Sequence, residues 1–136
     1  MPRYAETIWC DDIRQELGNK VTLAGVLGDE IVVPQVPVVV QSFAIVQRWH
    51  AENTEIDRGV GEFHFELEDP GGERNRFPIP QPVPRKGVHS TNLMFVLRFA
   101  MFPFRLKGEY KFRTYLNGRE VNTVSFYVVT PEDLPQ

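Results

Sequence analysis

Histidines and carboxylates are the residues of this chain that could bind a metal ion, and their spacing argues against a metal site. The histidines His50, His64 and His89 lie far apart and lack the short spacing, such as H-x-x-x-H, that zinc sites usually show. Acidic residues gather at two expected turns, but two short clusters fall short of the roughly six to eight oxygen ligands that calcium takes. Their members are Asp11, Asp12, Glu66, Glu68 and Asp69. The sequence therefore predicts no metal and no other cofactor.

No arrangement of side chains in the sequence is typical of a catalytic centre. Cys10, the single cysteine, is followed by Asp11 and matches no nucleophile motif; a cysteine on a strand acts more often as a small hydrophobic residue. No serine lies in a G-x-S-x-G turn, and no glycine-rich loop opens a helix to hold phosphate. We therefore predict no catalytic residue and expect the protein not to be an enzyme.

Basic residues concentrate at one place, around the proline-rich stretch 77–84. These residues are Arg74, Arg76, Arg85 and Lys86. Single-stranded nucleic acids bind to several aromatic side chains beside such charges, and here Phe77 stands alone. The formal net charge is −3 with both signs interspersed, so no overall field attracts nucleic acid or anionic lipid. A nucleic-acid partner is unlikely on these grounds, and the expected partner is another protein or a second copy of the chain.

The sequence also predicts where the protein resides. No apolar stretch approaches the ~18 residues that span a membrane, so no membrane association is expected. A lone cysteine cannot form an internal disulfide, and the first residues lack the basic and apolar regions of a secretory signal. These features favour a cytoplasmic protein.

The prolines at positions 78, 80, 82 and 84 alternate with other residues. Alternate residues of a strand direct their N–H groups to opposite edges, so these prolines would remove every donor from one edge. Ile79, Gln81 and Val83 would keep their donors on the other edge. The pattern predicts a strand that pairs on one side only.

Apolar and polar residues alternate along most of the chain, which predicts β-strands. The clearest strand covers 60–68, with Phe63, Phe65 and Leu67 on its inner face, and others are expected over 5–10, 21–27, 42–49, 93–101, 109–116 and 119–129. Segment 31–40, interrupted by prolines, predicts an edge strand or a connection. Segment 11–20 is interpreted as a turn between strands, with a short helix as the alternative. About seven or eight strands predict an all-β fold, an antiparallel two-sheet β-sandwich forming a single domain over residues 1–130, with a C-terminal tail at 131–136.

Asn117-Gly118 is the strongest hairpin signal in the chain, because a type I′ turn needs positive φ at both central residues. A two-residue loop sets residue 116 opposite 119 and places Val121 on the core side. Val124, Phe126 and Val128 then have the wrong parity for burial. We therefore predict a β-bulge at positions 122–123 that returns these residues to the core.

A glycine two residues before Tyr110 resembles the tyrosine corner of immunoglobulin-like sandwiches, so we expect Tyr110 to be buried with its hydroxyl bonded to nearby backbone. Three motifs carry a wider resemblance: C-D-D-x-R-x-E-x-G-N-K-x-x-L-x-G from Cys10, F-x-L-x-D-P-G-G from Phe65, and G-E-Y-x-F-x-x-Y-L-N-G from Gly108. Together they resemble an uncharacterised family of short bacterial single-domain proteins, a domain of unknown function with an Ig-like or C2-like β-sandwich. The resemblance covers nearly the whole chain. It implies a fold and no catalytic residues.

The segment 92–104 indicates where a partner could bind. If Leu93 and the alternate residues to Met101 face the core, the opposite face is too apolar for an ordinary wet surface. That candidate interface comprises Met94, Val96, Arg98, Ala100, Phe102 and Phe104. Either a partner covers it, or a loop of the same chain does, such as the proline-rich one. We expect a protein-interaction or self-assembly module; the alternative is a small-molecule or metal-binding sandwich, even an enzyme, with a site in the end loops.

Overall fold

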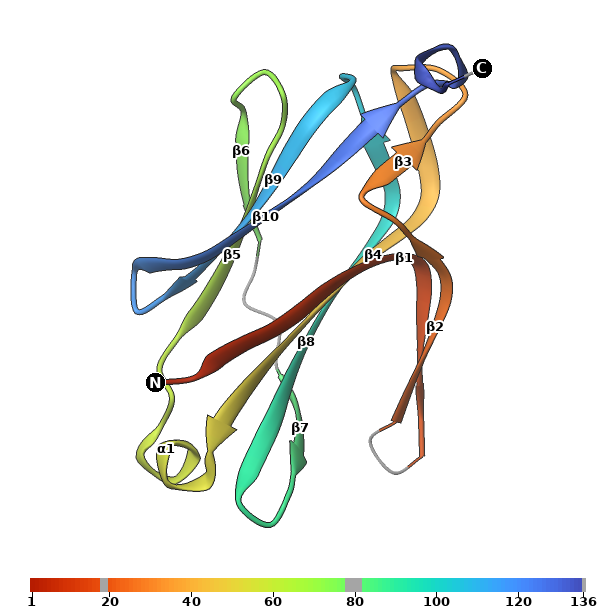
Figure 1. The fold of residues 1–136 in the computed structure, drawn as a ribbon. Coiled ribbons are helices and arrows are strands. Elements are labelled where there is room, and N and C mark those ends of the chain that lie inside the picture. The colour runs from red at the N-terminus through yellow and green to blue at the C-terminus, as the bar shows by residue number, and fades with distance from the viewer. Residues whose placement is uncertain (18–19, 78–81, 136) are drawn as a thin grey trace.

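The computed structural model describes residues 1–17, 20–77 and 82–135, which form two five-stranded sheets packed as a sandwich (Figure 1). Sheet A has the strand order β2-β1-β4-β8-β7, and sheet B has the order β3-β10-β9-β5-β6. The predicted all-β sandwich is confirmed, with ten strands in the described residues where about seven or eight were expected. β6 and β7 are the two beyond that number. The bounds in sheet A are β1 (Arg3–Glu16), β2 (Lys20–Leu27), β4 (Val38–Glu52), β7 (Val83–Lys86) and β8 (Ser90–Phe104). Those in sheet B are β3 (Glu30–Val32), β5 (Phe63–Glu68), β6 (Arg74–Phe77), β9 (Gly108–Leu116) and β10 (Arg119–Val129).

The helical content is small. Helix α1 (Asn53–Arg58) follows β4, and the 3-10 helix η1 (Pro131–Asp133) follows β10. No helix in the described part of the chain is long and apolar enough to cross a membrane.

Aromatic side chains from both sheets fill the space between them. Phe65, Phe112 and Phe126 of sheet B have no solvent exposure, and Phe95 of sheet A is also buried. The Phe65 and Phe112 rings stack at 5.5 Å, and the Phe65 and Phe95 rings lie 5.2 Å apart across the sheets. The expected inner face of 60–68 is confirmed, because Phe63, Phe65 and Leu67 are all buried.

One buried polar side chain joins the sheets by hydrogen bonds. Gln47 of β4 is fully buried, and its Oε1 accepts from Trp49 Nε1 at 2.7 Å and from Thr114 Oγ1 of β9 at 2.7 Å. Its Nε2 donates to Thr7 Oγ1 at 2.9 Å. The amide is therefore satisfied on both sides, as a buried polar group must be to avoid a desolvation cost.

The β9–β10 hairpin has the predicted turn and the predicted bulge. Asn117 and Gly118 have φ of 53° and 79°, and residue 116 pairs with residue 119. The register then shifts between Glu120 and Asn122, so Val121 is the extra residue. The bulge lies slightly earlier than the predicted 122–123, and both Val121 and Val124 pack against the core.

The expected inner face of 93–101 is correct up to Phe99 and wrong beyond it. Met101 has a φ of 55° and its side chain is 62% exposed. The pairing with β4 continues on both sides of it, from Ala100 to Phe102. In both β4 and β8, the alternation of inner and outer side chains is reversed beyond this point. Phe102 and Phe104 therefore lie on the inner face.

Predictions for three other segments remain to be compared with the structure. The segment 31–40 is the expected edge strand and connection only up to position 37: β3 pairs in parallel with β10 at the end of sheet B. Its last three residues begin β4, an interior strand of sheet A. The segment 11–20 is strand and turn, not helix, over its described residues. Positions 79 and 81 of the proline run lie outside the described residues. The strand that follows, β7, is the last of sheet A and pairs with β8.

Candidate functional site

The six residues of the candidate interface on β8 do not form one continuous surface. Met94 is 8% exposed and packs in a second apolar cluster on the outer side of sheet A, with Val96 at its margin. Arg98 and Ala100 are exposed. Phe102 and Phe104 do not lie on this face, because the side chains of β8 change sides of the sheet at Met101. Phe104 is part of the core, and Phe102 is partly buried at its margin.

The β1–β2 hairpin covers the apolar half of that face. β1 bends sharply, so that its second half and β2 leave the direction of the sheet (Figure 1). Just after the pairing of β1 with β4 ends at Cys10, Asp11 lies opposite Gly25, whose φ of 65° and lack of a Cβ let the Asp11 carboxylate approach. Beyond the bend, side chains of the hairpin join the cluster of Met94: Ile13, Val21 and Leu23. The chain thus covers the part of this face around Met94 with the hairpin. Most of the proline-rich loop, the cover expected from the sequence, lies outside the described residues.

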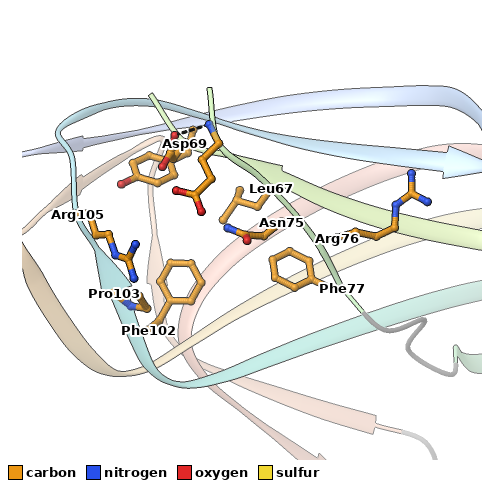
Figure 2. A pocket seen from close by; sticks show the side chains of 10 residues that line it. Leu67, Asp69, Asn75, Arg76, Phe77, Phe102, Pro103 and Arg105 are labelled. Atoms are coloured by element: carbon orange, nitrogen blue, oxygen red, sulfur yellow. Dashed lines mark hydrogen bonds between the residues drawn. The ribbon is translucent and has the colours of Figure 1, made fainter. Parts of the chain in front are cut away.

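A different open surface lies at one edge of the sandwich, between β6 of sheet B and the end of β8 of sheet A. It is a groove of about 400 Å³ (Figure 2). Figure 2 shows Phe102, Pro103 and Arg105 on one wall, with Leu67, Asn75 and Phe77 on the other. Asp69, Glu73, Arg76 and Tyr110 complete the lining. A volume of this order accommodates one or two large side chains or a small ligand.

The floor of the groove is aromatic and packed. The ring centroids of Phe77 and Phe99 are 4.9 Å apart, and those of Phe99 and Phe102 are 5.0 Å apart. Tyr110 is 3% exposed, and its hydroxyl donates to the Leu106 carbonyl oxygen at 2.8 Å, which confirms the predicted tyrosine contact. Burial raises the pKa of Tyr110. The hydroxyl is therefore a structural donor and stays protonated at neutral pH.

Two of the charged residues that line the groove are directed elsewhere. Asp69 Oδ1 accepts from the backbone N–H groups of Gly71 and Glu73, each at 2.9 Å, so this carboxylate holds the turn. Arg76 points away from the groove, and its guanidinium lies 5.8 Å from the ring centroid of Tyr115 (Figure 2). Arg105 is exposed on the facing wall. The lining is suited to contact with an extended ligand more than to a reaction at one atom.

Two strand edges flank the groove. β6 is the last strand of sheet B and pairs only with β5 among the described residues. In the same described part, β8 pairs with β7 only over 91–94 and has β4 alone beside its later half. The groove therefore lies between backbone edges that have hydrogen-bonding groups to offer.

The acidic cluster at Glu66 and Glu68 lies in a charged network on the outer face of sheet B. Glu68 Oε1 accepts from Arg113 NH1 at 2.9 Å and from Arg74 Nε at 2.8 Å. The Arg113 guanidinium, with Arg74 in addition, lowers the pKa of Glu68. Glu66 is 7% exposed, and Arg74 NH1 lies 3.6 Å from its Oε1. The network ties β5, β6 and β9 together, which gives these carboxylates a structural role.

The other residues considered for chemistry are dispersed. His64 Nε2 lies 4.0 Å from the Glu62 carboxylate, His50 is on β4, and His89 is exposed in the turn before β8. Cys10 is fully buried, and burial raises the pKa of its thiol. Within residues 1–17, 20–77 and 82–135, no group of three or more His, Cys, Asp or Glu side chains is placed to hold a metal.

Sequence reasoning missed the groove. β6 is four residues long, Arg-Asn-Arg-Phe, and is too short to show alternation. The basic pair Arg74 and Arg76 was the only signal near it. The groove also depends on Phe102 turning inward, which no pattern around Met101 indicates.

A protein-family model described as a family of unknown function, DUF6941, matches residues 7–129. The chain matches no curated protein sequence.

Proposed function

The chain belongs to DUF6941, a family of unknown function, and we propose that it is a non-enzymatic protein-interaction module whose binding site is the groove between β6 and the end of β8. The observation that carries the proposal is the combination of a groove with aromatic walls and an edge of β6 that no strand of the described residues occupies. An extended segment of another protein can pair its backbone with such an edge and place a side chain in the groove.

The shape and lining of the groove support a protein ligand. Its two walls carry Leu67, Phe77 and Phe102, and aromatic residues are enriched where proteins bind each other. Asp69 is held in its turn and Arg76 points away, which leaves Glu73, Asn75 and Arg105 as the polar residues that could orient a small ligand. A small-molecule site in the end loops, the alternative from the sequence, has less support for this reason.

The finer architecture and setting form part of the proposal. The contact of the Tyr110 hydroxyl with the Leu106 carbonyl supports an immunoglobulin-like sandwich. The buried lone Cys10 supports a reducing, cytoplasmic compartment. The motifs shared with bacterial proteins support a bacterial setting.

Selection of short random peptides displayed on phage tests the function. The wild-type protein should enrich peptides that bind it in solution by isothermal titration calorimetry. Asn75→Trp places a large side chain in the groove from an exposed position and should abolish this binding. Thr22→Trp is the matched control, because it adds the same side chain at an exposed position of β2, outside the groove lining.

The proposal is wrong if no peptide is enriched, or if the enriched peptides bind Asn75→Trp as well as they bind the wild type. Light scattering of the wild type tests the competing occupant, a second copy of the chain. A dimer that Asn75→Trp dissociates and Thr22→Trp leaves intact would replace the proposal by self-assembly.

A further inference from the structure

We propose that the groove binds an extended segment in which acidic and apolar residues alternate, added as a sixth strand of sheet B beside β6. The inference rests on the protein-interaction function proposed above and names the chemistry of the partner. It follows from three observations: which backbone groups β6 leaves free, which charges lie on its outer face, and what lines its inner face.

The ladder between β5 and β6 fixes which backbone groups are free. The Asp69 N–H donates to the Glu73 carbonyl oxygen at 2.9 Å at the turn end of the hairpin. Hydrogen-bonded and non-hydrogen-bonded pairs alternate along an antiparallel ladder, so positions 75 and 77 bond to β5. Arg74 and Arg76 then direct their N–H and C=O groups away from β5, to the edge that no described strand occupies. These are the groups that an added strand would bind.

The side chains of Arg74 and Arg76 favour acidic residues in the added strand. Arg74 and Arg76 lie on the outer face of sheet B, opposite Glu68 and Glu66. Residues of an added strand that pair with these arginines would share that face, because paired residues point to the same side of a sheet. Arg74 already binds Glu68, whereas Arg76 forms no ion pair within the described residues. A carboxylate opposite Arg76 would therefore gain a new ionic partner.

The position between the two arginines selects an apolar side chain. Asn75 lies on the inner face of β6, and a residue opposite it would point into the groove. There it would meet the aromatic surface of Phe77 and Phe102 and the side chain of Leu67. The volume of about 400 Å³ suits a leucine or a phenylalanine. The pattern read along the ligand is acidic, apolar, acidic.

The same charges disfavour a second copy as the occupant. Pairing of β6 with β6 would set arginine against arginine, and like charges opposite each other destabilise a sheet. Charged residues on a short edge strand prevent such self-association. An acidic segment converts this repulsion into attraction, so the partner differs in charge from β6.

Three synthetic peptides with uncharged, capped ends test the inference by isothermal titration calorimetry with the full chain. They are Glu-Phe-Glu-Leu-Glu, its basic counterpart Lys-Phe-Lys-Leu-Lys, and the polar Glu-Ser-Glu-Ser-Glu. The acidic apolar peptide should bind roughly fivefold or more tighter than the basic one, and the polar peptide should not bind. Arg76→Glu should reverse the order of the first two, whereas Arg14→Glu, the same charge change at an exposed position of β1, should preserve it.

The outcomes separate this inference from the function beneath it. Equal binding of the acidic and basic peptides, both blocked by Asn75→Trp, overturns the charge preference and leaves the interaction function standing. Absence of binding by the acidic peptide also overturns the inference, and the unbiased selection described above then decides the function independently. An order that Arg76→Glu leaves unchanged likewise overturns it, because the preference then arises elsewhere.

Discussion

Replacing Gln47 by leucine should destabilise the protein by about 3 kcal/mol. The substitution nearly preserves side-chain volume but removes the acceptor of Trp49 Nε1 and Thr114 Oγ1, both bonded at 2.7 Å. Each of these groups would then be buried without a partner, at a cost of about 1–2 kcal/mol. Thr7 also loses the hydrogen bond from Nε2, but its side chain lies nearer the surface and Tyr4 still donates to it at 3.0 Å. The loss is therefore set by two orphaned donors.

Urea unfolding followed by circular dichroism measures this loss, and Thr114→Val provides the matched comparison. Valine removes one donor and leaves Gln47 bonded to Trp49, so it should cost only about 1 kcal/mol. In the double variant no threonine hydroxyl is left without a partner. The double variant should therefore lose less unfolding free energy than the sum of the two single losses. A Gln47→Leu variant as stable as the wild type, or strict additivity, would refute the hydrogen-bonded link between the sheets.

Three further predictions concern single side chains. Tyr110→Phe should lower the free energy of unfolding by about 1 kcal/mol, because the bond to the Leu106 carbonyl is lost; an unchanged urea midpoint would contradict this. Gly118→Val should cost more than about 1 kcal/mol, since valine is disfavoured at a φ of 79°, and an unchanged melting temperature would contradict the turn assignment. The Arg113 guanidinium lowers the pKa of Glu68 from 4.5, so this carboxylate stabilises the fold above that pH, and the effect is lost as the pH falls through the lowered pKa. Glu68→Gln should therefore flatten the decline in stability below about pH 4.5, and a slope equal to that of the wild type would contradict the ion pair.

The parts of the fold that the sequence predicts correctly are those set by local chemistry. The turn at Gly118 and the burial of Phe63 and Phe65 follow from backbone preference and from alternation over several residues. The bulge in β10 follows from a parity conflict that is visible without coordinates. Its place was slightly wrong: the extra residue is Val121.

The errors arise where tertiary contacts decide the outcome. Met101 adopts positive φ without being glycine, so alternation along 93–104 gives the wrong face for Phe102 and Phe104. The cover over Met94 comes from Ile13, Val21 and Leu23 of the β1–β2 hairpin, more than seventy residues away in sequence. Neither the turnover of two paired strands nor the fold-back of a hairpin has a short sequence signature.

The candidate site could not be predicted from the sequence for the same reason. Its walls come from a four-residue strand and from a strand end whose facing is reversed. Arg74 and Arg76 were visible as a basic pair, yet only the sheet order places them on an edge strand beside a groove. The sequence contains the chemistry of the site, and the topology supplies its geometry.

Amide hydrogen exchange by NMR in the presence of a selected peptide tests the central claim most directly. The peptide is one that the wild-type chain enriches from the unbiased library. Strand addition at β6 predicts that the backbone amides of Arg74 and Arg76 become protected, while that of Thr22 on β2 exchanges at its previous rate. Protection confined to another edge, or exchange at Arg74 and Arg76 that the peptide leaves unchanged, would contradict the claim that this groove is where the protein binds its partner.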